Sequence, residues 1–202
     1  GVLGAFATAT KFLGIILLPA LFAEWFFTKG KRNINNLWAL VIIPAGLIFY
    51  MYYLQQTVGD PFSFFHSLTF FGEQRSVQPI ILPQVFWRYA KILVDIQKTD
   101  PLFLTVIIEL ITAVLFLVAS VFSFLKLRIS YAIYLALGYI IPTLSGSFSS
   151  LPRYCLILFP AFILFSIYLH KRPLFIQIGV IISLFMLLAV LTSMFVRGYW
   201  VS

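Results

Sequence analysis

The densest run of polar side chains lies at residues 145–154, which read S-G-S-F-S-S-L-P-R-Y. The hydroxyls and the glycine favour a tight turn, and Pro152 suits the first turn of a helix. Arg153 then falls near a helix N-terminus, where the helix dipole does not favour a cation. Its planar fork of donors nevertheless matches phosphate oxygens. Two interpretations stay open: Arg153 holds a specific phosphate, or it contacts ordinary lipid headgroups.

Two other charged residues interrupt apolar stretches. Lys11 follows the small and hydroxyl residues of Ala7–Thr10. Either this helix end turns toward a polar cavity, or the lysine extends to the membrane surface. Glu109 lies inside an apolar run, where an ionisable residue is a candidate functional residue. It could face a cavity, line a proton path or lie neutral against a neighbouring helix.

Signatures of soluble enzymes are missing from the sequence. There is no phosphate-binding glycine loop, no Cys/His cluster with metal-ligand spacing and no HExxH motif. His66 and His170 are far apart and are expected on opposite sides of the membrane. Cys155, the one cysteine, is expected to be a buried apolar residue. We therefore predict neither a metal site nor a cofactor.

Composition indicates that the bilayer is the solvent for most of the chain. Hydrophobic residues make up 62% of the 202 positions and charged residues 10%, with a mean hydropathy of +1.04. Soluble domains carry about 25% charged residues. The net charge of +8 does not indicate nucleic acid, because the cations lie in the breaks between apolar runs.

The apolar runs predict an all-α, polytopic membrane helical bundle with about six transmembrane helices. The runs are Val2–Phe27 (with a helix expected from about Phe12), Leu37–Leu54, Leu102–Leu125, Ile129–Leu144, Leu151–Leu169 and Leu174–Phe195. Asp100 and Pro101 form an N-cap and first-turn pair for the third run. Residues 1–202 are expected to form a single transmembrane domain. Because the sequence starts inside an apolar run, we expect it to be a C-terminal fragment of a larger membrane protein.

The short basic connections predict the orientation of the bundle. By the positive-inside rule they are cytoplasmic, and they hold Lys29, Lys31, Arg32, Lys126, Arg128, Lys171 and Arg172. Glu24 is expected to pair with these cations. The outer side then carries the loop 58–99, the link 145–150 and the C-terminus.

The outer loop 58–99 is expected to contain two short helices. Asp60 and Pro61 can cap the first, which would run to about Phe71. The second, Gln84–Gln97, is amphipathic with a partly cationic polar face. It either lies in the headgroup region or packs on the outer rim of the bundle.

Several short motifs, in order along the chain, resemble those of PIG-V-like mannosyltransferases of the GT-C class. The segments are Gly4–Lys11 (compare G-x-x-A-x-A-T-R/K) with Gly14 and Pro19, Gly59–Phe64 (G-D-P-x-x-F), Gly72–Arg75, Ser150–Tyr154 with Phe159 and Pro160 (S-x-P-R-Y…P), and Phe195–Trp200. The likeness covers only the C-terminal half of that family.

The resemblance implies transfer of a sugar, with mannose expected, from a polyprenyl-phosphate donor to a glycan, lipid or protein acceptor on the non-cytosolic face. The expected substrate-binding residues are Lys11, Asp60, Arg75, Arg153 and Tyr154. Arg153, supported by Tyr154, would contact the donor phosphate, Asp60 would position the outer loop, and Arg75 would touch the leaving phosphate. The acidic base of the class lies in an outer loop that nothing here matches, so no catalytic residue is predicted.

Two other functions stay open. One is a transporter or flippase for a lipid-linked substrate, although such folds often show repeats and midplane charges. The other is a non-catalytic scaffold subunit. For each of them the chain is a multi-pass membrane protein, expected in the plasma membrane of a prokaryote or the endoplasmic reticulum of a eukaryote.

Overall fold

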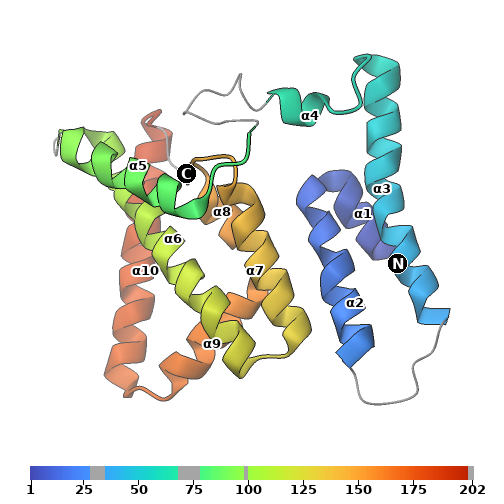
Figure 1. Ribbon diagram of the computed structural model, residues 1–202. Coiled ribbons are helices and arrows are strands. Elements are labelled where there is room, and N and C mark those ends of the chain that lie inside the picture. Colours follow the sequence, from blue (N-terminus) through green and yellow to red (C-terminus); the bar gives the residue numbers. More distant parts are fainter. Residues whose placement is uncertain (28–34, 68–77, 98–99, 200–202) are drawn as a thin grey trace.

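The computed structural model describes residues 1–27, 35–67, 78–97 and 100–199, and within these ranges the chain is helical, without strands (Figure 1). The elements are α1 (Val2–Thr10), the 3₁₀ helix η1 (Phe12–Ile16), α2 (Leu17–Phe27), α3 (Asn35–Thr57), α4 (Ser63–His66), α5 (Leu82–Asp95), α6 (Pro101–Lys126), α7 (Ile129–Thr143), α8 (Leu151–Cys155), α9 (Phe159–His170) and α10 (Leu174–Val196). The prediction of an all-α fold is confirmed.

Three of the described helices are long and apolar enough to cross a membrane. They are Leu37–Thr57 in α3, Leu102–Lys126 in α6 and Leu174–Val196 in α10. Three shorter apolar helical segments accompany them: Phe12–Phe27, Ile129–Thr143 and Phe159–His170. These lengths and compositions support a membrane protein.

Two helix boundaries that the sequence predicts are found in the structure. The Asp100 carboxylate accepts a hydrogen bond of 2.8 Å from the Leu102 N–H at the start of α6, with Pro101 in the first turn. The predicted N-cap is therefore confirmed. The first apolar run is also divided as expected, because Lys11 is extended (φ −150°, ψ 126°) between α1 and η1.

The fifth apolar run differs from the prediction. Instead of one helix over Leu151–Leu169, the chain forms α8, a short break and then α9. Pro160 explains the break, because it has no N–H to donate to the Leu156 carbonyl and is placed in the first turn of a new helix. Leu158, in the break, is fully buried.

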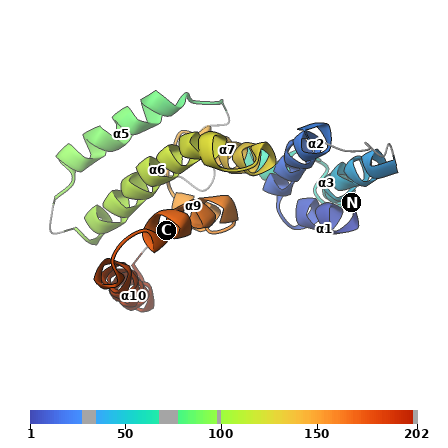
Figure 2. The same cartoon turned by 90° about the horizontal axis from the view of Figure 1, so that it is seen from below.

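The helices form two groups that meet where α2 packs on α7 (Figures 1 and 2). The first group is α1, η1, α2 and α3. The second contains α5, α6, α7, α8 and α9, and α5 lies across the upper end of α6 in Figure 1. At the opposite end, Glu24 of α2 accepts a hydrogen bond from Ser130 and forms a 3.4 Å ion pair with Arg128. This confirms the expected pairing of Glu24 with a cation of the basic connections.

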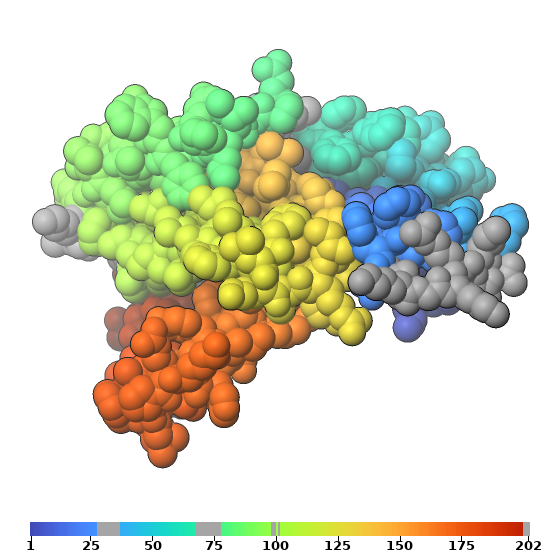
Figure 3. Space-filling model, turned by 60° about the horizontal axis from the view of Figure 1, so that its bottom comes forward, coloured from blue at the N-terminus to red at the C-terminus, as the bar shows by residue number. Residues whose placement is uncertain are grey.

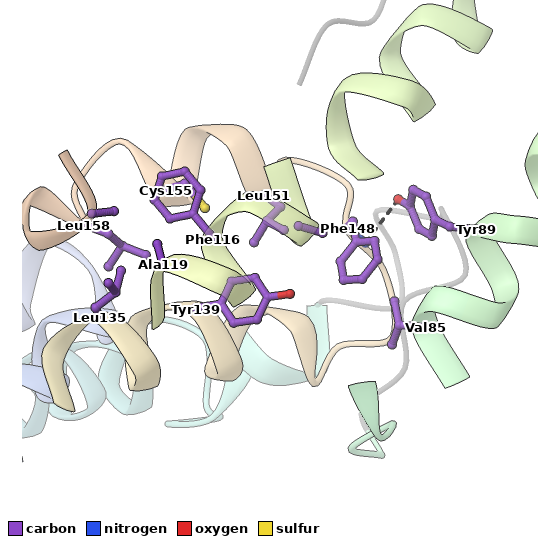
Figure 4. Close-up of a cluster of buried hydrophobic side chains, with 12 residues drawn as sticks. Val85, Tyr89, Phe116, Ala119, Leu135, Tyr139, Phe148, Leu151, Cys155 and Leu158 are labelled. Carbon is purple, nitrogen blue, oxygen red and sulfur yellow. Dashed lines mark hydrogen bonds between the residues drawn. The ribbon is translucent and has the colours of Figure 1, made fainter. Parts of the chain in front are cut away.

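A buried cluster joins the elements of the second group (Figure 4). It includes Val85 and Tyr89 of α5, Phe116 of α6, Tyr139 of α7 and Phe148 of the turn after α7. Cys155 also lies in this cluster, as expected for a buried apolar residue. The cluster holds α5 and the turn before α8 in fixed positions on α6 and α7.

The last helix, α10, stands apart from the rest. It packs mainly on α9, and no side chain of α10 is buried. Figure 3 shows the C-terminal helices projecting from the body of the molecule. The surface of α10 is almost entirely apolar, which suits contact with lipid tails.

Candidate functional site

Lys11 occupies the tight turn between α1 and η1. Its backbone N–H still donates to the Ala7 carbonyl at 3.1 Å, and its carbonyl accepts from the Gly14 N–H at 2.8 Å. A Cβ on Gly14 would lie 2.6 Å from the Ala7 carbonyl group, so this turn closes only around a glycine. The turn brings the Lys11 ammonium to 4.0 Å from the centre of the Tyr154 ring, a cation–π distance.

Arg153 directly precedes Tyr154 in α8, and its positive charge acts on Lys11. Its guanidinium donates a hydrogen bond to the hydroxyl of Ser150, the residue directly before α8. Partial burial lowers the pKa of Lys11, and the nearby positive charge of Arg153 lowers it further. Lys11, Arg153 and Tyr154, which we call the cationic cluster, are thus brought together from distant parts of the sequence.

Asp60 organises α4 and makes its described hydrogen bonds within its own turn. Its carboxylate accepts from the Phe62 N–H at 2.9 Å and pairs with His66 Nδ1 at 2.7 Å. The hydrogen bond with His66, followed by that from Phe62, holds the pKa of Asp60 below its usual value. Asp60 therefore stabilises the turn that leads into α4. The N-cap of α4, which covers Ser63–His66, is Phe62 and has no side-chain cap, so the predicted capping of this helix by Asp60 is wrong.

Aromatic contacts place α4 next to the turn that holds Lys11. The Phe12 ring lies 6.0 Å from Phe64 and 5.5 Å from Phe65, centre to centre. Asp60 is therefore connected to the cationic cluster through the position of α4. Arg75 and its neighbours in 72–75 lie outside the described residues.

A second polar group is buried under α5. The Tyr89 hydroxyl donates to Glu109 Oε2 at 2.7 Å and lies 3.3 Å from the Ser147 hydroxyl. It also accepts a hydrogen bond from the Phe148 N–H at 3.1 Å (Figure 4). Burial raises the pKa of the Tyr89 hydroxyl, and the charge of Glu109 adds to this effect. Glu109 itself is only 4% exposed. We call Tyr89, Glu109 and Ser147 the buried polar network.

The sequence identified Glu109 as a candidate but missed Tyr89. Tyr89 falls on the apolar side of the amphipathic helix, where it reads as a core residue. A buried tyrosine usually finds a hydrogen-bond partner, and a nearby intramembrane carboxylate is a natural one. That argument would have paired Tyr89 with Glu109 had the packing of α5 on α6 been known.

The turn between α7 and α8 connects the cationic cluster with the buried polar network. Gly146 adopts a positive φ of 83°, and its carbonyl accepts from Arg88 Nη1 at 3.2 Å. On one side of the turn Ser147 meets Tyr89, and on the other Ser150 meets Arg153. The run of hydroxyls in the sequence therefore contacts both the cationic cluster and the buried polar network.

No group of three or more His, Cys, Asp or Glu residues that could hold a metal ion occurs among the residues described. Comparison with known proteins finds no matching family model, no matching curated protein and no matching solved structure.

Proposed function

We propose that the chain is part of a membrane glycosyltransferase that takes a sugar, with mannose expected, from a polyprenyl-phosphate donor. The acceptor would lie on the non-cytosolic face. The sequence motifs that resemble PIG-V-like mannosyltransferases motivate this proposal. The observation that carries it is the contact of Lys11, from one of those motifs, with the ring of Tyr154, from another, where the charge of the neighbouring Arg153 acts on Lys11.

The electrostatics of the cationic cluster favour an anionic ligand. The positive charge of Arg153 repels that of Lys11, and this repulsion, after burial, contributes to the lowered pKa of Lys11. A phosphate between them would offset that repulsion and offer oxygens to the guanidinium fork. Tyr154 would limit the positions that the ammonium can adopt.

A membrane arrangement with six spans fits this function. The three shorter apolar segments would be the other three spans, in addition to α3, α6 and α10. Leu158, which is buried, would keep the break before α9 away from lipid. The end of α2, the α6–α7 connection and the α9–α10 connection all lie at the lower end of the molecule in Figure 1. In our proposal this basic end is cytosolic, and α4, α5 and α8 lie on the outer side.

Exposed apolar side chains next to the cationic cluster suit a polyprenyl tail. Leu156 is 70% exposed and Ile157 43% exposed, directly after the cluster residues of α8. A donor phosphate held by Arg153 would thus have its tail beside these residues and in lipid. On α5, Lys91 lies 5.5 Å from the ring centre of exposed Trp87, a pair typical of a membrane interface.

The test is substitution of Arg153 by alanine and by lysine in the protein at its natural full length. Membranes are incubated with radiolabelled polyprenyl-phosphate mannose, and both donor affinity and sugar transfer are measured. Because a charge-assisted hydrogen bond to phosphate is lost, we expect Arg153→Ala to weaken donor binding roughly ten- to hundredfold. Arg153→Lys should recover part of it, since lysine keeps the charge without the fork.

Arg172→Ala is the matched control, because Arg172 lies in the connection at the opposite end of the molecule. Donor affinity and turnover unchanged in Arg153→Ala would remove Arg153 from the site. Passage of the labelled donor across the membrane without any transfer would favour a transporter instead.

A further inference from the structure

A pocket separate from the cationic cluster opens between α5, α6 and the turn after α7. Its volume is about 250 Å³. Arg88 and Tyr89 line it from α5, Glu109 from α6 and Ser147 from the turn. This volume is near the lower end for small-molecule sites, which suits one sugar ring better than an oligosaccharide.

The pocket is polar at its inner end and apolar at its mouth. Glu109 is 4% exposed and Ser147 8% exposed, so their oxygens lie deep inside. Leu102, at 47% exposure, and the partly exposed Ile92 lie nearer the surface. A ligand that fits must therefore have a polar head and an apolar extension.

The charges of the lining favour a neutral head. Arg88 carries a positive charge and Glu109 a carboxylate, and both line the same pocket. A phosphate would approach the buried carboxylate and a cation would approach the guanidinium, so either would meet a like charge. A neutral hydroxyl can donate to Glu109 and accept from a donor such as the Ser147 hydroxyl.

We propose that this pocket binds the head of a neutral, polyhydroxylated amphiphile, a glycolipid with one exposed sugar ring. The sugar hydroxyls bind Glu109 and Ser147, while the alkyl part leaves past Leu102 and Ile92. This site goes beyond the proposed transfer and does not depend on it, because it uses neither Arg153 nor a phosphate.

The experiment measures binding of tritiated hexyl β-D-glucoside to the full chain in lipid nanodiscs, with empty nanodiscs subtracted. Glu109→Gln removes the charged acceptor while keeping a side chain of the same shape. Leu102→Trp narrows the mouth at an exposed position, where the larger ring need not be buried. We expect Glu109→Gln to weaken glucoside binding roughly tenfold, the usual scale of one lost hydrogen bond to a charged group. Leu102→Trp should also weaken glucoside binding, because the larger ring obstructs the mouth.

Glu24→Gln is the matched control for Glu109→Gln. Glu24 is also a hydrogen-bonded carboxylate on an apolar helix, but it lies beside Ser130 and outside the pocket. Glucoside binding is expected to be unchanged in it, and unfolding temperatures measured for every variant identify any loss that comes from misfolding.

Three outcomes would overturn the proposal. The first is wild-type glucoside binding in both pocket variants. The second is equal binding of hexanol, which would make the pocket a purely apolar cavity. The third is stronger competition by hexyl phosphate than by unlabelled hexyl glucoside, which would assign the pocket to anions.

Discussion

At the scale of single residues, the cationic cluster combines groups that repel one another unless a third group joins them. Lys11 and Arg153 are both cations, and the pKa of Lys11 is lowered first by burial and second by Arg153. The π face of Tyr154 attracts the ammonium of Lys11 and so offsets part of the repulsion between the two cations. Such an arrangement is more easily explained by a bound anion than by stability alone.

We predict that Arg153→Gln raises the pKa of Lys11 without restoring the ordinary value of 10.5, because burial remains. In the native chain the charged form of Lys11 lowers the stability of the fold, and this cost is complete below the pKa that Lys11 has in the folded state. It is relieved as the pH rises from that pKa toward the unfolded value, so stability increases in this window. The measurement is a pH titration of ¹³C-methylated lysine by NMR.

Arg172→Gln is the control for this titration, since it removes the same charge in the α9–α10 connection, which lies at the opposite end of the molecule. The Lys11 midpoint should not move in that variant. A midpoint that stays fixed in Arg153→Gln as well would contradict the proximity of the two cations.

The sequence singled out the residues of the cluster as candidates, but it did not predict how they are brought together. Lys11 and Arg153 were identifiable as charges at the edges of apolar runs. The contact of Lys11 with the Tyr154 ring depends on the packing of η1 and α2 against α7, which no local pattern encodes. Tyr89 was missed for the same reason, because its partner Glu109 lies on another helix.

At the scale of elements, glycine decides how closely α1 and α3 approach. A Cβ on Gly46 would lie 1.8 Å from the Ala5 carbonyl oxygen and 2.6 Å from the Thr8 hydroxyl. The Thr8 hydroxyl donates to the Ile43 carbonyl at 2.7 Å across the same contact. Small residues and hydroxyls at a close helix crossing are typical of membrane proteins. This crossing holds α1, and therefore the turn with Lys11, in place.

We predict that Gly46→Ala lowers the stability of the chain by about 1–3 kcal/mol, the usual cost of overpacking, since backbone cannot move aside as a side chain would. Thermal unfolding in detergent measures the effect. Gly179→Ala is the matched control: Gly179 is also inside a long apolar helix, α10, but an added Cβ there meets nothing within 4 Å. An equal loss of stability in both variants would show that helix packing is not the cause.

The helices themselves were easier to predict than their interruptions. The apolar runs over α3, α6 and α10 are long and continuous, so their existence followed from hydropathy. The break between α8 and α9 was missed because both flanks of Pro160 are apolar, and a proline in such a run can start a helix or bend one. The packing of Leu158 in the core accompanies the end of one helix and the start of the next.

At the scale of the whole molecule, charge is distributed between two ends. The α6–α7 and α9–α10 connections carry basic residues, and Glu24 binds Arg128 at the same end. The buried polar network and the cationic cluster lie toward the other end, near α4, α5 and α8 (Figure 1). The proposed orientation, with the basic end in the cytosol, assigns both candidate sites to the outer side.

Cysteine accessibility tests this orientation directly. Native Cys155 is 2% exposed, so in the folded chain it should react slowly with a membrane-impermeant maleimide and give a low background. We predict that Lys171→Cys, in the α9–α10 connection, is labelled only after the membrane is opened, because it faces the cytosol. Trp87→Cys, at an exposed position of α5, should be labelled in intact cells. The two substitutions control for each other, since both sites are exposed and differ only in the side they occupy. Labelling of both cysteines from the same side would show that the two ends of the molecule do not lie on opposite sides of the membrane. Labelling in the reverse order would put the cationic cluster in the cytosol, where a donor presented on the outer face could not reach it.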